Sequence, residues 1–488
     1  MRLSAASYST LPSTIFKPRY KRENLEIGIV HLGIGAFHRA HQAVYTDDVL
    51  NRNPGPWLIS GVSLRRPDTR DALVPQNGLY TLAIRDASEE RLRIIGSVTE
   101  ILVAPESPQA VLDRLCHPST KIVSLTITEK GYCHDPATGN LNTEHPDIRH
   151  DLTHPERPRS ALGFIVAAIS FRKAANLSAF TVLSCDNLPS NGDTIAKLLQ
   201  QFATLRDKAL GSWIHSHIPC PNSMVDRIVP ATTDDDRMVI DHAMGLSDSW
   251  PVVTEPFSQW VIEDRFASGR PAWEKEGVQF TKDVRPFELM KLRLLNGSHS
   301  SLAYLGYLSG FDKVADAMNS PIADFIKELM DKEIAPTLPP IDGIDLTRYK
   351  VALRERFYNS ALKHRTWQIA MDGSQKLPQR LLETIRDRLR DGASIQYLSL
   401  GVSAWMRYVY GQDEHGRKID VRDPMAAEFA RISAKTGPNA QSLAHELLAL
   451  RSIFGEDLPQ NRIFTDQVTV YLQKLFTHGA LAIVRSFF

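Results

Sequence analysis

Short hydrophobic runs alternate with polar, helix-like stretches in the first half of the chain. Four such runs are bounded by turn residues, a pattern typical of buried parallel strands. They lie at residues 25–32, 57–64, 121–128 and 179–184. Helix-like segments at 109–115, 160–175 and 194–205 lie between or after them. This alternation predicts an α/β fold with a Rossmann-type, doubly wound sheet.

The second half has a different pattern, which is mostly helical and contains few strand-like runs. The predicted helices cover residues 286–309, 322–334, 346–359, 377–391, 395–410, 425–434, 440–454 and 464–486. We therefore predict two domains. Residues 1–285 form a dinucleotide-binding domain, and residues 286–488 form a mainly α-helical substrate-binding and catalytic domain.

Charge and cysteine content narrow the class of protein. The 57 lysines and arginines nearly balance 56 aspartates and glutamates, which argues against a nucleic-acid or membrane-surface partner. Four scattered cysteines suggest neither a disulfide framework nor a zinc site, so we expect reduced thiols and a cytoplasmic protein. The longest apolar stretch, near 300–311, is about a dozen residues, fewer than the ~20 that a membrane span needs. The oligomeric state stays open between a monomer and a small homo-oligomer.

A glycine turn follows the first predicted strand. Gly33 and Gly35 should open a helix there, with backbone N–H groups facing a pyrophosphate. The usual third glycine position holds His38, so the GxGxxG motif is incomplete and a plain strand-to-helix turn is the alternative. Other candidates for cofactor contact in this turn are Ala36, Phe37, His38 and Arg39.

Residues after the second predicted strand bear on the choice of dinucleotide. Asp68 is the candidate for the adenosine ribose, which indicates NAD. Arg65 and Arg66 stand beside it and could instead favour the 2′-phosphate of NADP. We expect NAD, with NADP possible and a charged surface loop as the plain alternative.

Three polar residues interrupt the apolar helix predicted at 286–309. At about 100° per residue, Lys291 and His299 are about 80° apart and Asn296 and His299 about 60°, whereas Lys291 and Asn296 differ by about 140°. Desolvation would suit Lys291 to exchange a proton with a hydroxyl near neutral pH. Gly297 would let a ligand or a strand approach closely. A buried helix with no chemistry is the alternative.

Three other polar segments are candidates for contributing residues to a functional site. Residues 184–187 and 128–131 each end a predicted strand, where open α/β sheets bind ligands. Residues 371–376 form a polar loop between helices, with Arg365 before it and Arg380 after it. An ordinary structural loop is the alternative for each.

Seven ordered motifs resemble the polyol-specific long-chain dehydrogenases, the mannitol dehydrogenase and fructuronate reductase group. They read GIGAFHRAHQ, LTITEKGY, SCDNLPSNGD, MVDRIVP, EPFSQWVIED, MKLRLLNGSHS and MDGSQKLPQR. They run from residue 33 to 380, and weaker similarity continues beyond 450, so the resemblance covers almost the whole chain. It implies a Rossmann-type domain, a largely helical C-terminal domain and an active site between them.

The resemblance also implies roles for individual residues. Lys291 is the general base in alcohol oxidation and the general acid in ketone reduction, without zinc. Asn187 and Asn296 form the pair that stabilises an oxyanion. His299 hydrogen-bonds the reacting oxygen.

Four further residues take supporting roles by the same resemblance. Lys376 and Asp226 contact other groups of the substrate. Glu129 and Glu288 relay protons between the lysine and water, and Glu129 is also a candidate for cofactor contact. The sequence has no zinc-ligand pattern, which agrees with a metal-independent mechanism.

The substrate prediction depends on residues 365–376, which resemble the fructuronate reductase branch. The mannitol branch carries an arginine where this chain has Gln368. A uronate carboxylate is stabilised by a positively charged side chain, and the candidates are Arg365, Lys376 and Arg380. By contrast, residues 250–253 and 270–280 are similar to the mannitol branch too.

We therefore expect an NAD-dependent oxidoreductase that interconverts D-fructuronate and D-mannonate. A mannitol 2-dehydrogenase, or a related polyol or hexuronate dehydrogenase, is the alternative. A nucleotide-binding regulatory or scaffold protein without turnover is the hypothesis from another class. It predicts NADH binding with no oxidation of any sugar or sugar acid.

Overall fold

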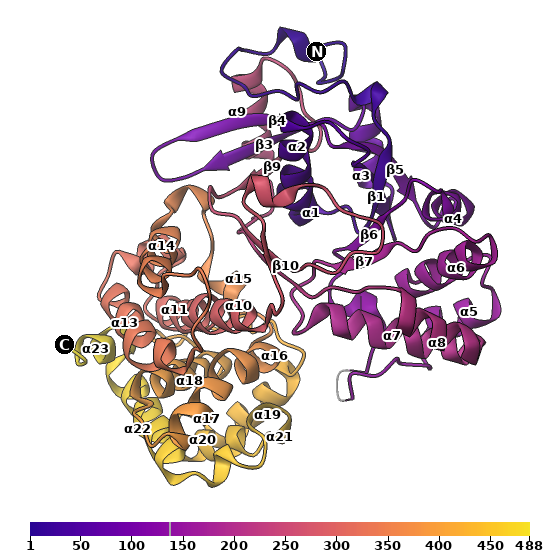
Figure 1. The fold of residues 1–488 in the computed structure, drawn as a ribbon. Coiled ribbons are helices and arrows are strands. Elements are labelled where there is room, and N and C mark those ends of the chain that lie inside the picture. The colour runs from indigo at the N-terminus through magenta and orange to yellow at the C-terminus, as the bar shows by residue number, and fades with distance from the viewer. Residues whose placement is uncertain (136–137) are drawn as a thin grey trace. The chain divides into compact units, whose positions relative to one another are not determined.

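The computed structural model describes residues 1–135 and 138–488, and the chain divides into two compact units, Met1–Arg285 and Pro286–Phe488. The N-terminal unit is built on a five-stranded sheet in the order β5-β2-β1-β6-β7 (Figure 1). The strands are β1 (Ile27–Leu32), β2 (Leu58–Ser63), β5 (Val98–Val103), β6 (Ile122–Leu125) and β7 (Thr181–Ser184). All neighbouring pairs are parallel, and the strand order reverses between β1 and β6. This arrangement confirms the predicted Rossmann-type sheet.

The sheet is covered by helices on both faces. Val30 and Leu32 of β1 pack in one hydrophobic cluster with residues of several helices. These helices include α4 (Pro108–Cys116), α6 (Ala161–Ala174), α7 (Asn191–Arg206) and α8 (Lys208–His217). Ile29 points to the other face and packs in a second cluster with α1 (Ala36–Ala40) and α2 (Gln42–Arg52). Strands buried on both faces need continuous apolar runs, which explains why four of the five were predictable.

Two small sheets of the N-terminal unit were not predicted. One has the order β4-β3-β9 and the other β11-β10-β8. Their strands are β3 (Tyr80–Arg85), β4 (Glu90–Ile95), β8 (Ser223–Asp226), β9 (Val252–Thr254), β10 (Gln259–Glu263) and β11 (Gln279–Thr281). The remaining α-helices of this unit are α3 (Asp68–Leu73), α5 (Pro146–Thr153) and α9 (Asp234–Met244). Strands of three to six residues with mixed polarity give too little periodicity to be recognised.

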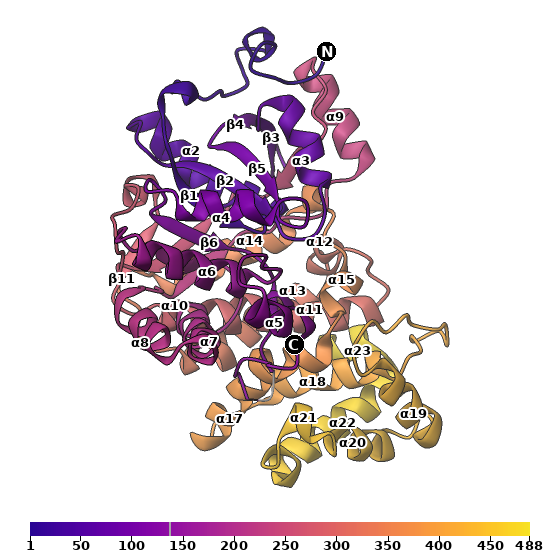
Figure 2. The same cartoon turned by 90° about the vertical axis from the view of Figure 1, so that its right-hand side faces the viewer.

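The C-terminal unit is helical, as predicted, and α18 (Gln396–Val409) is its most buried helix. This helix packs against α11 (Ser298–Leu308) and α22 (Arg462–His478), and Figure 2 shows it beside the yellow C-terminal helices. The other α-helices are α10 (Arg285–Met290), α12 (Val314–Met318), α13 (Ile322–Glu328), α14 (Leu346–Tyr358), α15 (Thr366–Ala370), α16 (Gly373–Leu377), α17 (Glu383–Arg390), α19 (Ala426–Thr436), α20 (Ala440–Leu448), α21 (Arg451–Phe454) and α23 (Ala480–Arg485).

Several predicted helices differ in detail from the observed ones. The helices predicted at 286–309, 322–334 and 377–391 contain the π-helical segments Lys291–Gly297, Leu329–Ile334 and Pro378–Leu382. The helix predicted at 464–486 is broken at Gly479, whose φ of +79° ends α22 and starts α23. Backbone changes of this kind leave the apolar pattern of a helix intact, so the pattern does not reveal them.

Across residues 1–135 and 138–488, no helix combines the length and the apolar character that crossing a membrane requires.

Candidate functional site

The glycine turn at the end of β1 depends on the absence of a side chain at residue 33. Gly33 has φ of +95°, and a Cβ on it would lie 2.2 Å from the carbonyl oxygen of Thr126. Its N–H donates to the carbonyl oxygen of Val62 at 2.8 Å. Gly35 precedes the first residue of α1. The turn therefore sits where β1, β2 and β6 end, at the reversal point of the sheet, which is the usual dinucleotide position.

His38 and Arg39 are two of the residues predicted to contact the cofactor. Both are buried, and the ring of His38 stacks on that of His31 with centroids 3.4 Å apart. Arg39 donates from Nη1 to the carbonyl oxygen of Trp250 at 2.6 Å, and its guanidinium covers the ring of Tyr80. The guanidinium of Arg39 therefore has partners within the protein, and its contact with the cofactor stays a prediction.

Ala36 and Phe37, the other two candidates of this turn, begin α1. Both are half-buried and pack against the hydrophobic cluster on that face of the sheet. The ring of Phe37 stacks on that of His41, with centroids 5.1 Å apart. Neither side chain lies among the described residues that line the neighbouring pocket.

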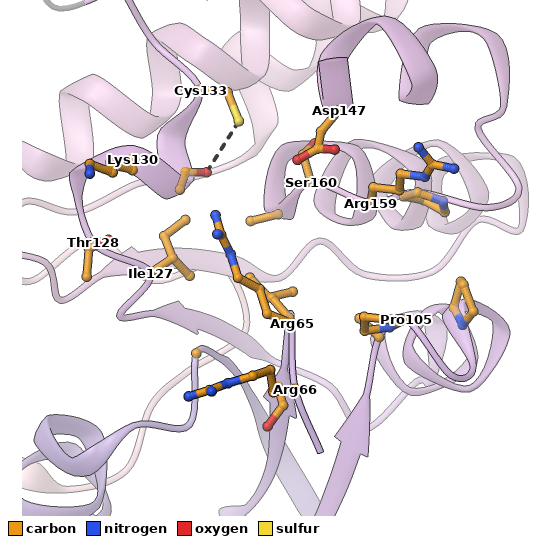
Figure 3. A pocket seen from close by; sticks show the side chains of 18 of the residues that line it. Arg65, Arg66, Pro105, Ile127, Thr128, Lys130, Cys133, Asp147, Arg159 and Ser160 are labelled. Atoms are coloured by element: carbon orange, nitrogen blue, oxygen red, sulfur yellow. Dashed lines mark hydrogen bonds between the residues drawn. The ribbon is translucent and has the colours of Figure 1, made fainter. Parts of the chain in front are cut away.

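A pocket of about 970 Å³ adjoins the glycine turn within the N-terminal unit. Gly33, Gly35 and Thr128 form part of its wall, and the α5–α6 region forms another part. Figure 3 shows Arg65 extending into it beside Ile127, while Arg66 runs in another direction from the same strand end. Its charged lining comprises Arg65, Arg66, Lys130, Arg157, Arg159 and Asp147, and its histidines are His145, His150 and His154. Five cations against one carboxylate make the pocket suited to phosphate groups.

Asp68, the predicted ribose ligand, is not among the residues that line this pocket. It starts α3, its side chain is 47% exposed, and its Oδ2 lies 3.4 Å from Nε of Arg66. Arg65 and Arg66 do line the pocket. The structure thus brings the two arginines, rather than the carboxylate, to the end of β2 beside the pocket.

Asp186 holds the strand end that carries Glu129. Its two carboxylate oxygens accept from the N–H groups of Ile127 and Thr128, each at 2.9 Å, and one also accepts from the Tyr132 hydroxyl at 2.8 Å. Thr128 has φ of +61°, a conformation that costs a β-branched residue about 1–3 kcal/mol. The motif at residues 184–187 predicts that this region belongs to a site, but it does not predict the hydrogen bonds by which Asp186 holds the end of β6.

The other predicted residues of the N-terminal unit occupy strand ends or the segments after them. Glu129 is exposed, and its Oε1 lies 3.9 Å from Nε2 of His134. Asn187 is exposed and follows Asp186 after β7. Asp226 is buried at the end of β8. The three therefore lie near the carboxyl ends of β6, β7 and β8 respectively.

Lys291 and Asn296 lie together in the π-helical segment Lys291–Gly297. Lys291 is buried and Asn296 is half-buried. The predicted α-helical angles do not hold here, because a π turn bonds residue i to residue i+5 and so brings these two nearer the same side of the helix. Glu288 lies one turn earlier, in α10, and is half-buried.

Gly297 allows another helical segment to approach closely. A Cβ on it would lie 2.7 Å from the main-chain oxygen of Arg380, which belongs to the π segment Pro378–Leu382. The close approach expected at this glycine therefore comes from a helix, not from a strand. The contact continues where Nη1 of Arg380 donates to Oγ of Ser300 at 3.0 Å.

His299 sits in a buried and basic environment. Its ring stacks on Phe357 at 4.9 Å and meets His364 edge-on at 5.0 Å. Its Nε2 is buried and has no hydrogen-bond partner in the described structure. Burial, followed by the charges of His364, Arg380, Arg356 and Lys376, holds the pKa of His299 well below its usual range. The imidazole is therefore neutral at physiological pH and can form a hydrogen bond with a substrate oxygen.

Lys376 and Arg365, both predicted to bind substrate, differ in their surroundings. Nζ of Lys376 donates to the carbonyl oxygen of Met371 at 2.6 Å and lies 4.0 Å from Oδ2 of Asp372. Burial, together with the charge of Arg380, lowers the pKa of Lys376 to about 8. Arg365 is exposed and immediately precedes α15. The charge of Lys376 contributes to the lowered pKa of His299.

Among the described residues, no group of three or more histidine, cysteine, aspartate and glutamate side chains is arranged to hold a metal ion. The four cysteines are unpaired, and burial raises the pKa of Cys133 and Cys220 to about 12. Thiol chemistry at these two positions is therefore disfavoured at neutral pH.

Comparison with known proteins agrees with this architecture. Residues 27–275 match the mannitol dehydrogenase Rossmann domain, and residues 283–476 match the mannitol dehydrogenase C-terminal domain. The chain is 48% identical over 480 residues to D-mannonate oxidoreductase of Escherichia coli, covering 97% of each chain. It is also similar to Mannitol dehydrogenase DSF1 of Saccharomyces cerevisiae, with 41% identity over 99% of this chain and 97% of the relative.

A solved structure gives the same result. The ternary complex of Pseudomonas fluorescens mannitol 2-dehydrogenase with NAD and D-mannitol has a TM-score of 0.90 and 41% sequence identity, covering 100% of this chain and 99% of the other. Similarity of this extent in both sequence and fold defines the family. The chain belongs to the mannitol dehydrogenase family of oxidoreductases, enzymes that act on secondary alcohols.

Proposed function

We propose that the protein is an NAD-dependent oxidoreductase that interconverts D-fructuronate and D-mannonate. The observation that carries this choice of substrate is the basic environment of His299, to which Arg380, Arg356 and Lys376 contribute. A sugar acid brings a negative charge that such an environment stabilises, whereas a neutral polyol does not. The 48% identity to D-mannonate oxidoreductase supports the same choice.

The pocket beside the glycine turn is the proposed cofactor site. The backbone at Gly33 and Gly35 fits the approach of a pyrophosphate, and the cations of the lining fit its charge. NAD, when bound, supplies the acceptor or donor of the hydride. Because Arg65 and Arg66 line the pocket, NADP stays the alternative, and a comparison of rates with NADH and NADPH decides between them.

Lys291 is the proposed acid and base. In oxidation its amine takes the proton of the substrate hydroxyl, and in reduction its ammonium returns that proton to the oxygen. Asn296 and Asn187 are proposed to donate amide N–H groups to the same oxygen, and His299 to hydrogen-bond it through Nε2. Glu288 and Glu129 are proposed to pass protons between Lys291 and water.

The remaining predicted residues are assigned to other parts of the ligands. Asp226, Lys376 and Arg365 are proposed to contact substrate hydroxyl or carboxylate groups. Arg365 has the weakest support of the three, since it is exposed. Asp68 is proposed for the cofactor ribose only if it turns from its contact with Arg66.

A panel of substrates tests the proposal. Oxidation of NADH is measured with D-fructuronate, D-tagaturonate and D-fructose, and we expect the highest kcat/KM with D-fructuronate. A higher value with D-fructose would instead identify a mannitol 2-dehydrogenase, the second candidate, which the 41% identity to the Pseudomonas fluorescens enzyme favours. NADH binding without turnover of any of these compounds would indicate a binding protein.

A further inference from the structure

Arg380, in the π segment Pro378–Leu382, is a half-buried cation that has no carboxylate partner among the described residues. The nearby Arg293 pairs with Asp387 at 2.6 Å, and Lys376 lies 4.0 Å from Asp372. For Arg380 the recorded side-chain contact is the donation from Nη1 to the neutral hydroxyl of Ser300.

Burying a cation without a counter-ion is unfavourable, because the cation loses its hydration and gains no opposite charge in return. Burial lowers the pKa of Arg380 to about 10, so the guanidinium is still charged at neutral pH. The free protein thus maintains a partly accessible, uncompensated positive charge. An anionic ligand would remove this cost when it binds.

Arg380 is located close to the residues proposed for catalysis. Its main chain faces Gly297, and its guanidinium contacts Ser300, on either side of His299 in the sequence. Lys376 lies four residues earlier, one helical turn away, and its charge also acts on His299. A ligand that hydrogen-bonds Nε2 of His299 therefore comes within reach of the guanidinium.

We propose that Arg380 binds the carboxylate of the substrate and thereby selects a sugar acid over a neutral polyol. This inference rests on the proposed function and names the residue that sets its substrate class. Ser300 occupies Nη1, and the remaining N–H donors of the planar guanidinium match the two oxygens of a carboxylate. D-Fructuronate carries its carboxylate and its ketone toward opposite ends of one carbon chain, so His299 and Arg380 can bind different ends of one molecule.

The other candidate cations are less suited to this role. Arg365 is exposed. Lys376 already donates to the carbonyl oxygen of Met371 and lies near Asp372. Arg356 acts on His299 but has an interaction of its own. Arg380 therefore combines charge, nearness to His299 and absence of a carboxylate partner.

The test compares Arg380→Gln and Arg380→Lys in the full-length enzyme with the control Arg390→Gln. Arg390 lies on α17, is 73% exposed and pairs with Asp387, so its replacement removes an exposed positive charge to which no role is assigned. Values of kcat and KM are measured with NADH for D-fructuronate and D-fructose. Calorimetry gives the affinity of the NADH-loaded enzyme for D-mannonate and D-mannitol.

We expect Arg380→Gln to raise KM for D-fructuronate and Kd for D-mannonate by about 10- to 100-fold, the range of a charged hydrogen bond. The constants for D-fructose and D-mannitol should change less than about twofold, since neither carries a charge for the guanidinium to bind. Arg380→Lys should fall between wild type and Arg380→Gln, because lysine keeps the charge but not the planar fork. Arg390→Gln should match wild type.

Equal losses on acids and neutral sugars, or a KM for D-fructuronate within twofold of wild type, overturn the assignment. If Arg380→Gln does not fold, Ser300→Ala replaces it. That variant removes the hydrogen bond that holds the Arg380 guanidinium in its orientation. It should weaken D-mannonate binding but not D-mannitol binding, and an unchanged D-mannonate affinity counts against the proposal. If the wild type turns over a different sugar acid, the proposed function fails, whereas the role of Arg380 holds if the variants lose affinity for that acid.

Discussion

Lys291 is a buried lysine in a π-helical segment, and the proposed chemistry depends on it. Replacing it with alanine removes the proton donor and acceptor, so kcat should fall by about 10²–10⁴-fold, the usual contribution of general acid–base catalysis. NADH affinity should be retained. Stopped-flow turnover and NADH fluorescence titration measure the two quantities.

The matched control for this variant is Lys332→Ala. Lys332 is 60% exposed and pairs with Glu328 on the surface, so its loss should leave turnover unchanged. Near-normal turnover of Lys291→Ala would remove Lys291 from the mechanism. Loss of NADH binding together with turnover would instead indicate a structural defect.

The lowered pKa of Lys376 leads us to expect that substrate binding depends on pH. Its pKa is lowered to about 8 by burial and by Arg380, with Asp372 and Asp423 acting in the opposite direction. The ammonium is therefore present below about pH 8 and is lost as the pH rises through that value. KM for an anionic substrate should rise between pH 7 and 9, and Lys376→Met should remove this rise. An unchanged profile in the variant would assign the titration to another group.

At the scale of elements, Gly297 determines how two π segments pack. Gly297→Ala places a Cβ 2.7 Å from the main-chain oxygen of Arg380, and main chain cannot rotate away as a side chain can. We expect a loss of about 1–3 kcal/mol in the free energy of unfolding, the usual cost of overpacking. Urea denaturation measures it.

Gly306→Ala on α11 is the comparison for this variant. Its Cβ would meet side-chain atoms of Ala317 at 3.1 Å and Thr366 at 3.3 Å, which can shift by a few tenths of an ångström. We expect a smaller loss of stability than at Gly297. A larger loss at Gly306 would show that the contact between the two π-helical segments is not the more important one.

Asp186 supports another element, the end of β6. Asp186→Ala removes the acceptors of the Ile127 and Thr128 N–H groups and leaves the unusual backbone of Thr128 unsupported. We expect destabilisation by about 1 kcal/mol, because the two N–H groups that lose their acceptors are only partly buried. Because Thr128 lines the proposed nucleotide pocket, KM for the cofactor should rise as well. A cofactor KM equal to that of the wild type would show that Asp186 supports the end of β6 without affecting cofactor binding.

The sequence pattern predicted elements better than it predicted side-chain directions. Four of the five strands of the main sheet are apolar runs buried on both faces, so the pattern identified them, whereas the strands of the small sheets mix polar and apolar residues or are very short. Lys291, Asn296 and His299 were predicted as site residues because they are polar and interrupt an apolar helix. The orientation of Arg39 could not be found this way, since its partner, the carbonyl oxygen of Trp250, lies 211 residues away.

At the scale of the whole molecule, the two compact units should respond differently to cofactor. The proposed nucleotide pocket has a lining that comes entirely from Met1–Arg285. NADH at about 100 times its Kd should stabilise the native state by about 2.7 kcal/mol through mass action. We expect hydrogen exchange to slow first in β1, β2 and β6. Protection confined to residues 286–488 would place the nucleotide elsewhere.

The π segment Lys291–Gly297 has a consequence for how this helix tolerates change in its length. A π turn is equivalent to an α-helix into which a residue has been inserted. Deleting one residue there would let the segment relax to a regular α-helix, and the turns before and after it would keep nearly the same phase, because the π turn already absorbs one extra residue. Deleting a residue from the regular turns of α11 would instead shift everything before it by about 100° relative to everything after it. A one-residue deletion should therefore disturb the relative directions of the flanking helices less within Lys291–Gly297 than within α11.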